Sequence, residues 1–330
     1  MLLRQQGVEI LILSRDKDVM LELLDELSLD HRCISRARSG ILGSIFELLL
    51  RECRVLFHVL KFRPQLLLSA HSVAITHIGW LLGIPRLVHE DTEFGTLQQK
   101  LYMPFASKIL TSTAYYLDWG KKQLRIPSLE PLAYLHPNHF TADASRLASY
   151  GLHENTRYAV IRTIAWQAMH DRGLEGIDST QVKELVGQLR SMGYEKIVLS
   201  SEEKLDDELA GQVIQPGAKD LHQLIAFSQL CISESISVAG EAAVLGIPTL
   251  LVNPLRAGHS LELEKYGLLE RHVDMQSTLQ RATEISRDKD VIRRWADRRR
   301  RLLEDKSDMT RDFAEIISWS LSEATAKNVP

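Results

Sequence analysis

The residues best suited to chemistry lie between positions 231 and 254, in the segment CISESISVAGEAAVLGIPTLLVNP. An apolar run ending at Ile232 predicts a strand, and Ser235 and Ser237 stand where a helix should begin. Backbone N–H groups and the dipole at a helix N-terminus favour an anion. Glu241, further along that helix, could accept hydrogen bonds from hydroxyl groups beside it. A site for phosphate beside a site for hydroxyl groups is typical of nucleotide binding. Alternatively, Ser235 could serve only as a helix cap and Glu241 as a solvated charge.

Three carboxylates follow the predicted strand Arg86–His89. Functional groups of parallel α/β sheets collect at the carboxyl ends of strands. One of Glu90, Asp91 and Glu93 could therefore act as a general base toward an acceptor hydroxyl. The same side chains could instead orient an acceptor sugar, or cap the helix predicted to begin near Thr96.

A third group surrounds the end of the predicted strand Tyr158–Arg162. Arg162 could balance the charge of a leaving diphosphate. In the loop that follows, Trp166 could stack on a base or a sugar, and His170 could donate hydrogen bonds. The alternative is an irregular loop with a buried tryptophan and a surface histidine.

Other polar groups have simpler structural explanations. His71 follows a predicted strand, and a lone histidine beside apolar neighbours usually has a structural role. Pro137 forces an extended backbone on His136, near the expected domain boundary. Residues Arg293–Arg301 carry six arginines around Trp295. Such a basic helix could lie on an anionic membrane surface, although a solvated helix face is the commoner explanation.

Strand-like apolar runs alternate with helix-length amphipathic segments, which predicts an α/β fold with parallel sheets. The predicted strands are Val8–Leu13, Gln65–Ser69, Arg86–His89, Lys108–Thr111, Tyr158–Arg162, Lys196–Leu199, Leu230–Ser233 and Thr249–Val252. The predicted helices include Lys17–Leu27, Ile45–Lys61, Thr180–Met192, Leu221–Phe227 and Asp288–Asp305.

An internal echo favours two similar halves. The segment GWLLGIPRLV at 79–88 and the segment AVLGIPTLLV at 243–252 both place a glycine and a proline between a helix and a strand. We therefore expect an N-terminal Rossmann-like acceptor-side domain over 1–140 and a linker over 141–157. A C-terminal Rossmann-like nucleotide-sugar domain with a final helix would cover 158–330. The chain begins at what should be the second strand, so we expect the first strand of the N-terminal domain to be missing.

Composition sets outer limits on function. The chain has 330 residues, 45% of them hydrophobic, with a formal net charge of −3. That charge gives no reason to expect a nucleic-acid partner. The apolar runs are too short to span a bilayer, and three dispersed cysteines favour the cytoplasm over a disulfide scaffold or a zinc site.

These motifs resemble an uncharacterised bacterial and archaeal family of glycosyltransferase-like proteins, related to UDP-N-acetylglucosamine 2-epimerases and GT-B glycosyltransferases. The resemblance covers nearly the whole chain. Its carriers are Asp91-Thr92-Glu93 after LLGIP, YLHPNHF at 134–140, IRTIAWQAMHD at 161–171, ESISVAGEAAVLGIP, and Glu264-Lys265-Tyr266-Gly267.

The resemblance implies a GT-B-like fold, with two Rossmann-like domains facing each other across a cleft. It also implies that Glu241 contacts the ribose of a nucleotide sugar and that the turn at Ser235 and Ser237 contacts its diphosphate. No cofactor and no metal would be required. One departure is Ile236, which stands where the family has glycine and could crowd a phosphate.

We therefore expect a cytoplasmic glycosyltransferase that uses a nucleotide sugar, with UDP as the expected carrier. Its acceptor would be a saccharide or a lipid-linked sugar in cell-envelope or surface-polysaccharide synthesis, with peripheral membrane contact through Arg293–Arg301. Two alternatives stay open. One is a nucleotide-sugar epimerase or hydrolase of the 2-epimerase type, and the other is a non-catalytic nucleotide-sugar-binding partner.

Overall fold

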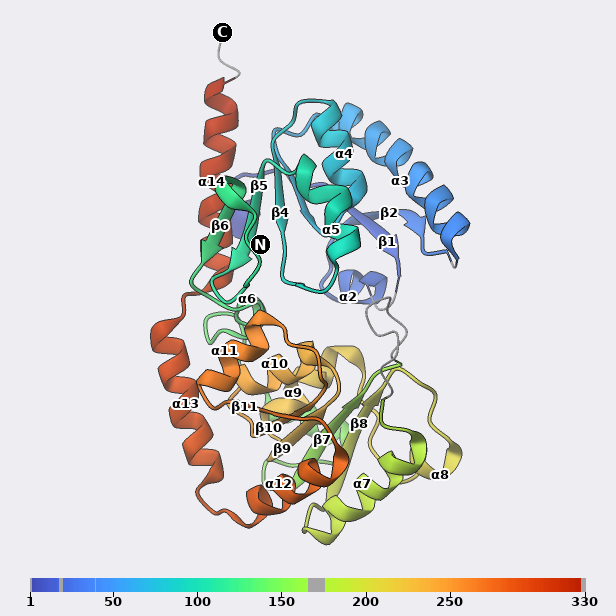
Figure 1. The fold of residues 1–330 in the computed structure, drawn as a ribbon, viewed down its shortest axis with the longest axis vertical. Helices are drawn as coiled ribbons and strands as arrows, with labels where there is room; N and C mark the ends of the chain where they lie inside the picture. The colour runs from blue at the N-terminus through green and yellow to red at the C-terminus, as the bar shows by residue number, and fades with distance from the viewer. Residues whose placement is uncertain (1, 18–19, 39, 166–175, 328–330) are drawn as a thin grey trace. The chain divides into compact units, whose positions relative to one another are not determined.

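The computed structural model describes residues 2–17, 20–38, 40–165 and 176–327, and the chain divides into two compact units. Unit 1 comprises Met1–Ile126 together with Met309–Pro330, and unit 2 comprises Pro127–Asp308 (Figure 1). In both units the paired strands run parallel, as the alternation of strand and helix patterns predicts.

Unit 1 contains two parallel sheets. One pairs β1 with β2, and the other has the order β3-β4-β5-β6. The strands are β1 (Ile12–Asp16), β2 (His31–Arg36), β3 (Leu67–Ala70), β4 (Arg86–His89), β5 (Lys108–Ser112) and β6 (Gln123–Ile126). The helices are α1 (Leu2–Gln5), α2 (Met20–Glu26), α3 (Ile41–Phe62), α4 (Val73–Leu81), α5 (Thr96–Tyr102) and α14 (Met309–Lys327). Apolar side chains of β2, α3, β3 and α4 form one core cluster of this unit.

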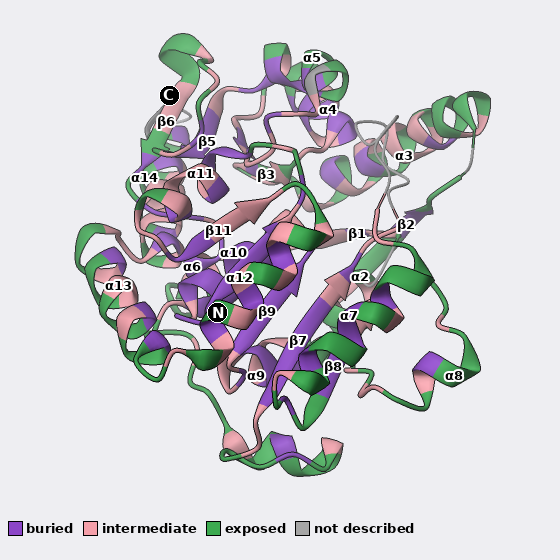
Figure 2. Cartoon of the chain, turned by 60° about the horizontal axis from the view of Figure 1, so that its bottom comes forward, coloured by how far each residue is buried: buried purple, intermediate pink, exposed green. Residues whose placement is uncertain are grey.

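Unit 2 contains one parallel five-stranded sheet with the order β11-β10-β9-β7-β8. The strands are β7 (Tyr158–Thr163), β8 (Lys196–Ser201), β9 (Leu230–Ser233), β10 (Thr249–Val252) and β11 (Leu269–His272). The helices are α6 (Leu132–Leu135), α7 (Ser179–Ser191), α8 (Asp207–Ala210), α9 (Leu221–Ala226), α10 (Ile236–Val244), α11 (Gly258–Lys265), α12 (Met275–Arg287) and α13 (Val291–Asp305). Figure 2 shows β7 and β9 as buried strands, which explains their apolar runs Tyr158–Ile161 and Leu230–Ile232.

The predicted strands are found, and three further ones are added. Strands β4, β9 and β10 have the predicted bounds, whereas β1 begins four residues later than Val8. The strands that the pattern missed are β2, β6 and β11. Their sequences HRCISR, QLRI and LERH mix charged with apolar residues, and β6 and β11 lie at sheet edges, where one side needs no apolar cover.

The two halves of the internal echo fold alike. Gly83 follows α4 with φ 68°, and Gly246 follows α10 with φ 83°. In both turns the next residue donates its backbone N–H to a carbonyl five residues earlier, at 2.9 Å for Ile84 and 3.1 Å for Ile247. Each glycine therefore ends a helix in the left-handed conformation that glycine adopts most readily.

The division into units differs from the predicted boundaries. Unit 2 begins at Pro127, so the predicted linker 141–157 lies inside it. The reason is packing, because Leu147 and Leu152 are fully buried in the same core cluster as Tyr158. Helix α14 belongs to unit 1, where its Phe313 lies 5.0 Å from the ring of His89, centroid to centroid.

Candidate functional site

The strand order of unit 2 reverses between β7 and β9. Read from β8, the sheet runs second, first, third, fourth, fifth along the chain, as in doubly wound folds. Ligands of such sheets bind at the carboxyl ends of the strands where the order reverses. Here β7 ends at Thr163 and β9 ends at Ser233, directly before α10. The predicted serine-rich turn therefore lies at the expected ligand-binding edge.

Glu234 links the backbone segments that meet at this edge of the sheet. Its carboxylate is 1% exposed and accepts backbone N–H groups from Ile164 at 3.1 Å and Ile177 at 2.7 Å. Its own N–H donates to the Arg162 carbonyl at 2.9 Å. Glu234 thus holds both ends of the connection from β7 to α7, and we assign it a structural role.

The N-terminus of α10 keeps the polar surface that the sequence predicts. Ser235 is the N-cap, and its Oγ accepts the N–H of Val238 at 3.3 Å. Ser237 is exposed in the first turn. Ile236 is the first helical residue, and it is not among the non-glycine residues with positive φ. The structural objection to isoleucine at this position therefore does not apply to its backbone.

Glu241 lies in the middle of α10 and is 9% exposed. Tyr134 donates its hydroxyl to Oε1 at 2.7 Å, and Nε2 of His222 lies 3.1 Å from Oε2. The rings of Tyr134 and His222 are 5.5 Å apart and inclined at 37°. Each carboxylate oxygen thus has one partner on unit 2 and can accept a further hydrogen bond.

The other predicted donor-site residues fall into two groups. Arg162 donates to Ser200 Oγ at 2.9 Å and pairs with Glu202 at 2.5 Å, so its charge is already balanced. Trp166 and His170 lie outside the described residues. A pocket lined by Arg157, Tyr194 and neighbouring residues lies at the opposite, amino-terminal edge of the sheet.

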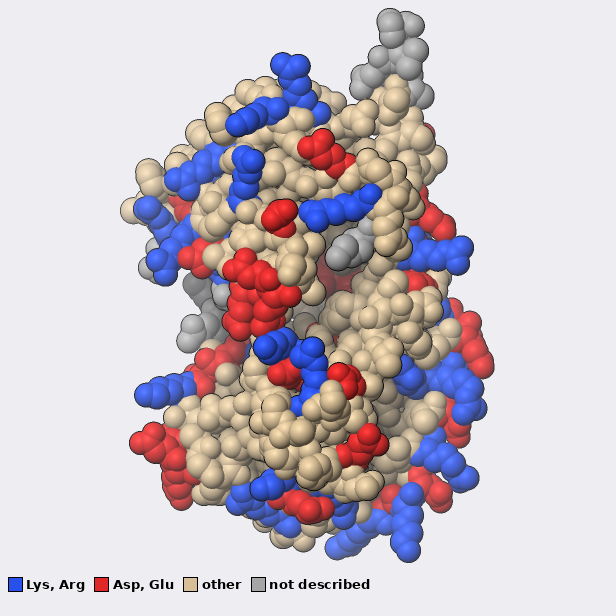
Figure 3. All heavy atoms as spheres, turned by 180° about the vertical axis from the view of Figure 1, so that it is seen from behind, with Lys and Arg blue, Asp and Glu red and all other residues tan. Residues whose placement is uncertain are grey.

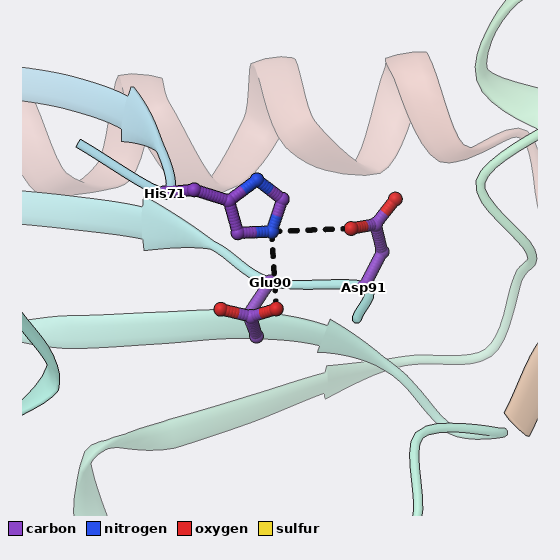
Figure 4. A group of neighbouring side chains, drawn as sticks. All are labelled: His71, Glu90 and Asp91. Carbon is purple, nitrogen blue, oxygen red and sulfur yellow. Dashed lines mark hydrogen bonds and ion pairs between the residues drawn. The ribbon is translucent and has the colours of Figure 1, made fainter. Parts of the chain in front are cut away.

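In unit 1 a histidine joins two of the predicted carboxylates (Figure 4). Nε2 of His71 lies 3.0 Å from Glu90 Oε1 and 3.2 Å from Asp91 Oδ1. Strand β3 ends one residue before His71, and β4 ends one residue before Glu90. Because β3 and β4 are parallel neighbours, their carboxyl ends bring these side chains together.

The charges of this cluster reinforce one another. Burial by itself lowers the pKa of His71, but hydrogen bonds to Asp91 and Glu90 outweigh burial and raise that pKa to about 10. Burial by itself raises the pKa of Asp91, but His71 outweighs it and holds that pKa well below its usual range. These pKa shifts favour a protonated His71 beside an ionised Asp91 at neutral pH.

The three predicted carboxylates have different surroundings. Glu90 is fully buried, and it accepts hydrogen bonds from Tyr102 Oη and from the Thr92 N–H, the latter at 2.8 Å. Glu93 is 4% exposed. Asp91 keeps a third of its side chain exposed, and it accepts the hydroxyl of Thr92 at 3.0 Å. Asp91 is therefore the carboxylate best placed to meet a ligand.

The same three groups have the residue types of a metal site, with ligand atoms within 4.8 Å of one another. A histidine must give up its proton to bind a metal through that nitrogen. Metal binding through Nε2 of His71 would therefore have to break its ion pairs with Glu90 and Asp91.

The arginine-rich helix α13 does not present an apolar face. Trp295 is fully buried and donates Nε1–H to the Leu268 carbonyl at 3.0 Å. Arg298 stacks on the Trp295 ring, and Arg299 donates to the Val244 carbonyl at 2.8 Å. Trp295 thus packs into unit 2, and the predicted membrane contact through Arg293–Arg301 would depend on the exposed arginines of α13. Acidic and basic side chains are intermixed on the face in Figure 3.

Sequence reasoning missed three residues that the fold brings to these positions. His71 was expected to be structural, Tyr134 entered only as part of the segment YLHPNHF, and His222 carried no signal. Each depends on contacts across distant parts of the chain: Glu90 lies 19 positions after His71, and Glu241 lies 107 positions after Tyr134. A single sequence offers no local pattern for such pairs.

Comparison with solved structures identifies the fold class. A candidate UDP-N-acetylglucosamine 2-epimerase from Listeria monocytogenes matches with TM-score 0.65 and 11% identity, over 97% of this chain and 89% of that chain. A UDP-N-acetylglucosamine 2-epimerase from Neisseria meningitidis matches with TM-score 0.63 and 13% identity, over 96% and 91%. A Streptomyces glycosyltransferase matches with TM-score 0.63 and 12% identity, over 96% of this chain and 93% of that chain. The predicted GT-B-like α/β fold is confirmed.

Sequence comparison adds a family of unknown function. Residues 2–123 match the family described as "Protein of unknown function (DUF354)". An uncharacterised protein of Methanocaldococcus jannaschii is 23% identical over 110 residues, which are 33% of this chain and 32% of that protein. The chain thus spans about a third of the length of the curated relative it matches. The predicted resemblance to an uncharacterised family is supported over residues 2–123.

No helix within the described ranges has the length and apolar character needed to cross a bilayer.

Proposed function

We propose that this protein is a glycosyltransferase that takes a nucleotide-linked sugar as donor, with UDP as the expected carrier. The observation that carries the proposal is the carboxyl edge of the unit 2 sheet. There α10 begins at the point where the strand order reverses, and Glu241 follows on the same helix. A helix N-terminus suits a diphosphate, and a carboxylate beside it suits ribose hydroxyls.

The structural neighbours support a nucleotide-sugar ligand. One is a Neisseria 2-epimerase bound to UDP-N-acetylglucosamine, and another is a Streptomyces glycosyltransferase in complex with thymidine diphosphate. Ser235, Ser237 and Glu241 would bind the donor. Trp166 and His170 remain candidates for the base or sugar, and Arg162 would assist only if Glu202 released it. The acceptor, a saccharide or a lipid-linked sugar, would belong to cell-envelope or surface-polysaccharide synthesis.

The His71 cluster would serve the acceptor. Asp91 would accept a hydrogen bond from the acceptor hydroxyl, and Glu90 would hold His71 in place. In this proposal Asp91 orients the hydroxyl more readily than it removes its proton, because the lowered pKa makes Asp91 a weak base. Glu93 is too buried to reach an acceptor without rearrangement. No metal and no cofactor would be required.

Nucleotide binding tests the proposal directly. UDP, GDP, CDP and dTDP would be titrated in thermal unfolding of wild type, Glu241→Gln, Glu241→Ala and the control Glu208→Ala. Glu208 is an exposed acid of unit 2 that pairs with Lys183. A diphosphate at about 100 times its dissociation constant should add about 2.7 kcal/mol to the free energy of unfolding. That gain should be reduced in both Glu241 variants and kept in the control.

Three other outcomes would change the assignment. Binding of no diphosphate would refute the donor site. Turnover of UDP-N-acetylglucosamine without an acceptor would assign epimerisation or hydrolysis in place of transfer. Binding that never leads to turnover, with any saccharide or lipid-linked acceptor, would assign a non-catalytic partner.

A further inference from the structure

Helix α3 carries an unusual amount of exposed apolar surface. Ile41 and Leu42 at its first turn are 81% and 84% exposed. Phe46, Leu49, Phe57 and Leu60 continue the exposed side, with between 54% and 61% of each residue accessible. The spacing of Leu42, Phe46 and Leu49 is that of one helix face. Figure 1 shows α3 at the outside of unit 1, beside α4.

The opposite side of α3 is a normal core face. Val55 and Val59 are buried in a cluster with residues of β2, β3 and α4. The helix is thus anchored by one apolar stripe and exposes a second one. A soluble helix normally turns polar residues to water on that second side. The buried stripe alone therefore anchors α3, and folding does not require the exposed apolar stripe.

The charges of α3 are sorted between its two sides. The two acids turn inward: Glu47 is 2% exposed and pairs with Arg15 at 3.0 Å, and Glu52 pairs with His77 at 2.7 Å. The exposed charges on the helix and just beyond its ends are cations, namely Arg38, Arg54, Lys61 and Arg63. Arg38 lies over the Phe46 ring, 4.9 Å from its centroid. The exposed side of α3 is thus apolar with a positive border.

The neighbouring helices also expose apolar side chains. Trp80 and Leu81 of α4 are 58% and 63% exposed, and Leu97 of α5 is 63% exposed. His77 ties the three helices together, since it bonds to Glu52 of α3 and to the Leu101 carbonyl of α5 at 2.8 Å. These bonds hold α3, α4 and α5 in place relative to one another within unit 1.

We propose that α3 lies on an anionic membrane surface, with its exposed apolar side among the lipid chains and its cations at the headgroups. Amphipathic helices with large apolar residues and a basic border bind such surfaces in this way. The proposal does not depend on the sugar chemistry proposed above. A second copy of the chain fits less well, because two such faces would bring cationic borders together and offer them no exposed acid of α3.

Vesicle binding tests this proposal with the full chain. Sedimentation with phosphatidylcholine vesicles, with and without phosphatidylglycerol, would be measured for four proteins. These are wild type, the apolar variant Leu42→Ser/Phe46→Ser, the charge variant Lys61→Ala/Arg63→Ala, and a control Ile292→Ser/Arg293→Ala on α13. Ile292 and Arg293 are also exposed, which makes the control a matched change on another helix.

Wild type and control should bind only the vesicles that contain phosphatidylglycerol. The partition coefficient of the apolar variant should fall by more than about tenfold. That of the charge variant should fall by about fivefold or more. Added salt should weaken the binding of wild type. Equal thermal unfolding of all four proteins would show that the changes are local. Failure of wild type to bind, or equal loss in the control, would overturn the proposal. So would a wild-type dimer that the apolar variant alone dissociates, since α3 would then meet a second copy.

Discussion

At the scale of single residues, His71 shows how backbone and charge combine. Its φ is 57°, in the left-handed region that few residues other than glycine occupy. That conformation follows β3 directly and leaves the side chain between Glu90 and Asp91. Unfavourable backbone angles tend to persist where the surroundings demand them, often at functional sites. The observation supports a role for this cluster beyond packing.

The His71 pKa can be measured by NMR titration of the imidazole. We expect a value near 10 in wild type and a lower one in Asp91→Asn, because that variant removes one of two carboxylate partners. His153→Gln, a change at an exposed histidine of unit 2, should leave the His71 titration unchanged. A wild-type value near the ordinary 6.5 would refute the imidazolium.

The same ion pairs predict how stability depends on pH. The raised pKa of His71 adds stability that is fully present below 6.5 and is lost as the pH rises through about 10. The lowered pKa of Asp91 adds stability that is present above 3.8 and is lost in more acidic solution. His71→Gln should therefore cost most between pH 3.8 and 6.5, by about 2 kcal/mol after solvent screening. Urea unfolding at several pH values would measure this; a cost unchanged above pH 10 would contradict it.

At the scale of elements, the two Gly-Ile-Pro turns share a conformation and differ in their surroundings. An added Cβ at Gly83 would meet nothing within 4 Å. At Gly246 it would lie 2.8 Å from Arg299 Cδ, and that arginine bonds to the Val244 carbonyl. The same three-letter sequence thus serves an open turn in unit 1 and a crowded one in unit 2.

Alanine substitution separates these two effects. Gly83→Ala should cost about 1 kcal/mol, the cost of left-handed backbone for an L-residue. Gly246→Ala should cost about 1–3 kcal/mol more, because Arg299 must also move. Chemical unfolding of the two variants measures the difference. Equal losses would show that Arg299 yields freely.

At the scale of the whole molecule, unit 2 is one uninterrupted chain segment with adjoining ends. Ser307 donates its N–H to the Pro127 carbonyl at 2.9 Å, and Ser128 Oγ donates to the Ser307 carbonyl at 2.6 Å. Unit 1, in contrast, takes α14 from the far end of the chain. Gln6 and Gln65 of unit 1 bond to Ser318 and Thr325 of that helix.

This connectivity predicts unequal behaviour of two fragments. Residues 127–308 alone should unfold cooperatively, since their core and their joined ends are complete. Residues 1–126 alone should be markedly less stable, because they lack the helix that covers part of unit 1, and an added peptide of residues 309–330 should restore stability. Circular dichroism and urea unfolding of each fragment would measure this. An unfolded 127–308 fragment would contradict the division.

The sequence by itself determined the local plan of this protein. Apolar periodicity predicted the buried strands β7, β9 and β10, and Gly-Ile-Pro marked two helix-to-strand turns, because both signals depend on neighbouring residues. The tertiary structure decided what those signals could not reach. Edge strands with polar sequences, the pairing of His71 with Glu90 and Asp91, and the return of α14 to unit 1 all depend on contacts between distant residues. The exposed side of α3 belongs to this second group, because a pattern shows that a helix is apolar, and only packing shows which apolar side chains remain uncovered.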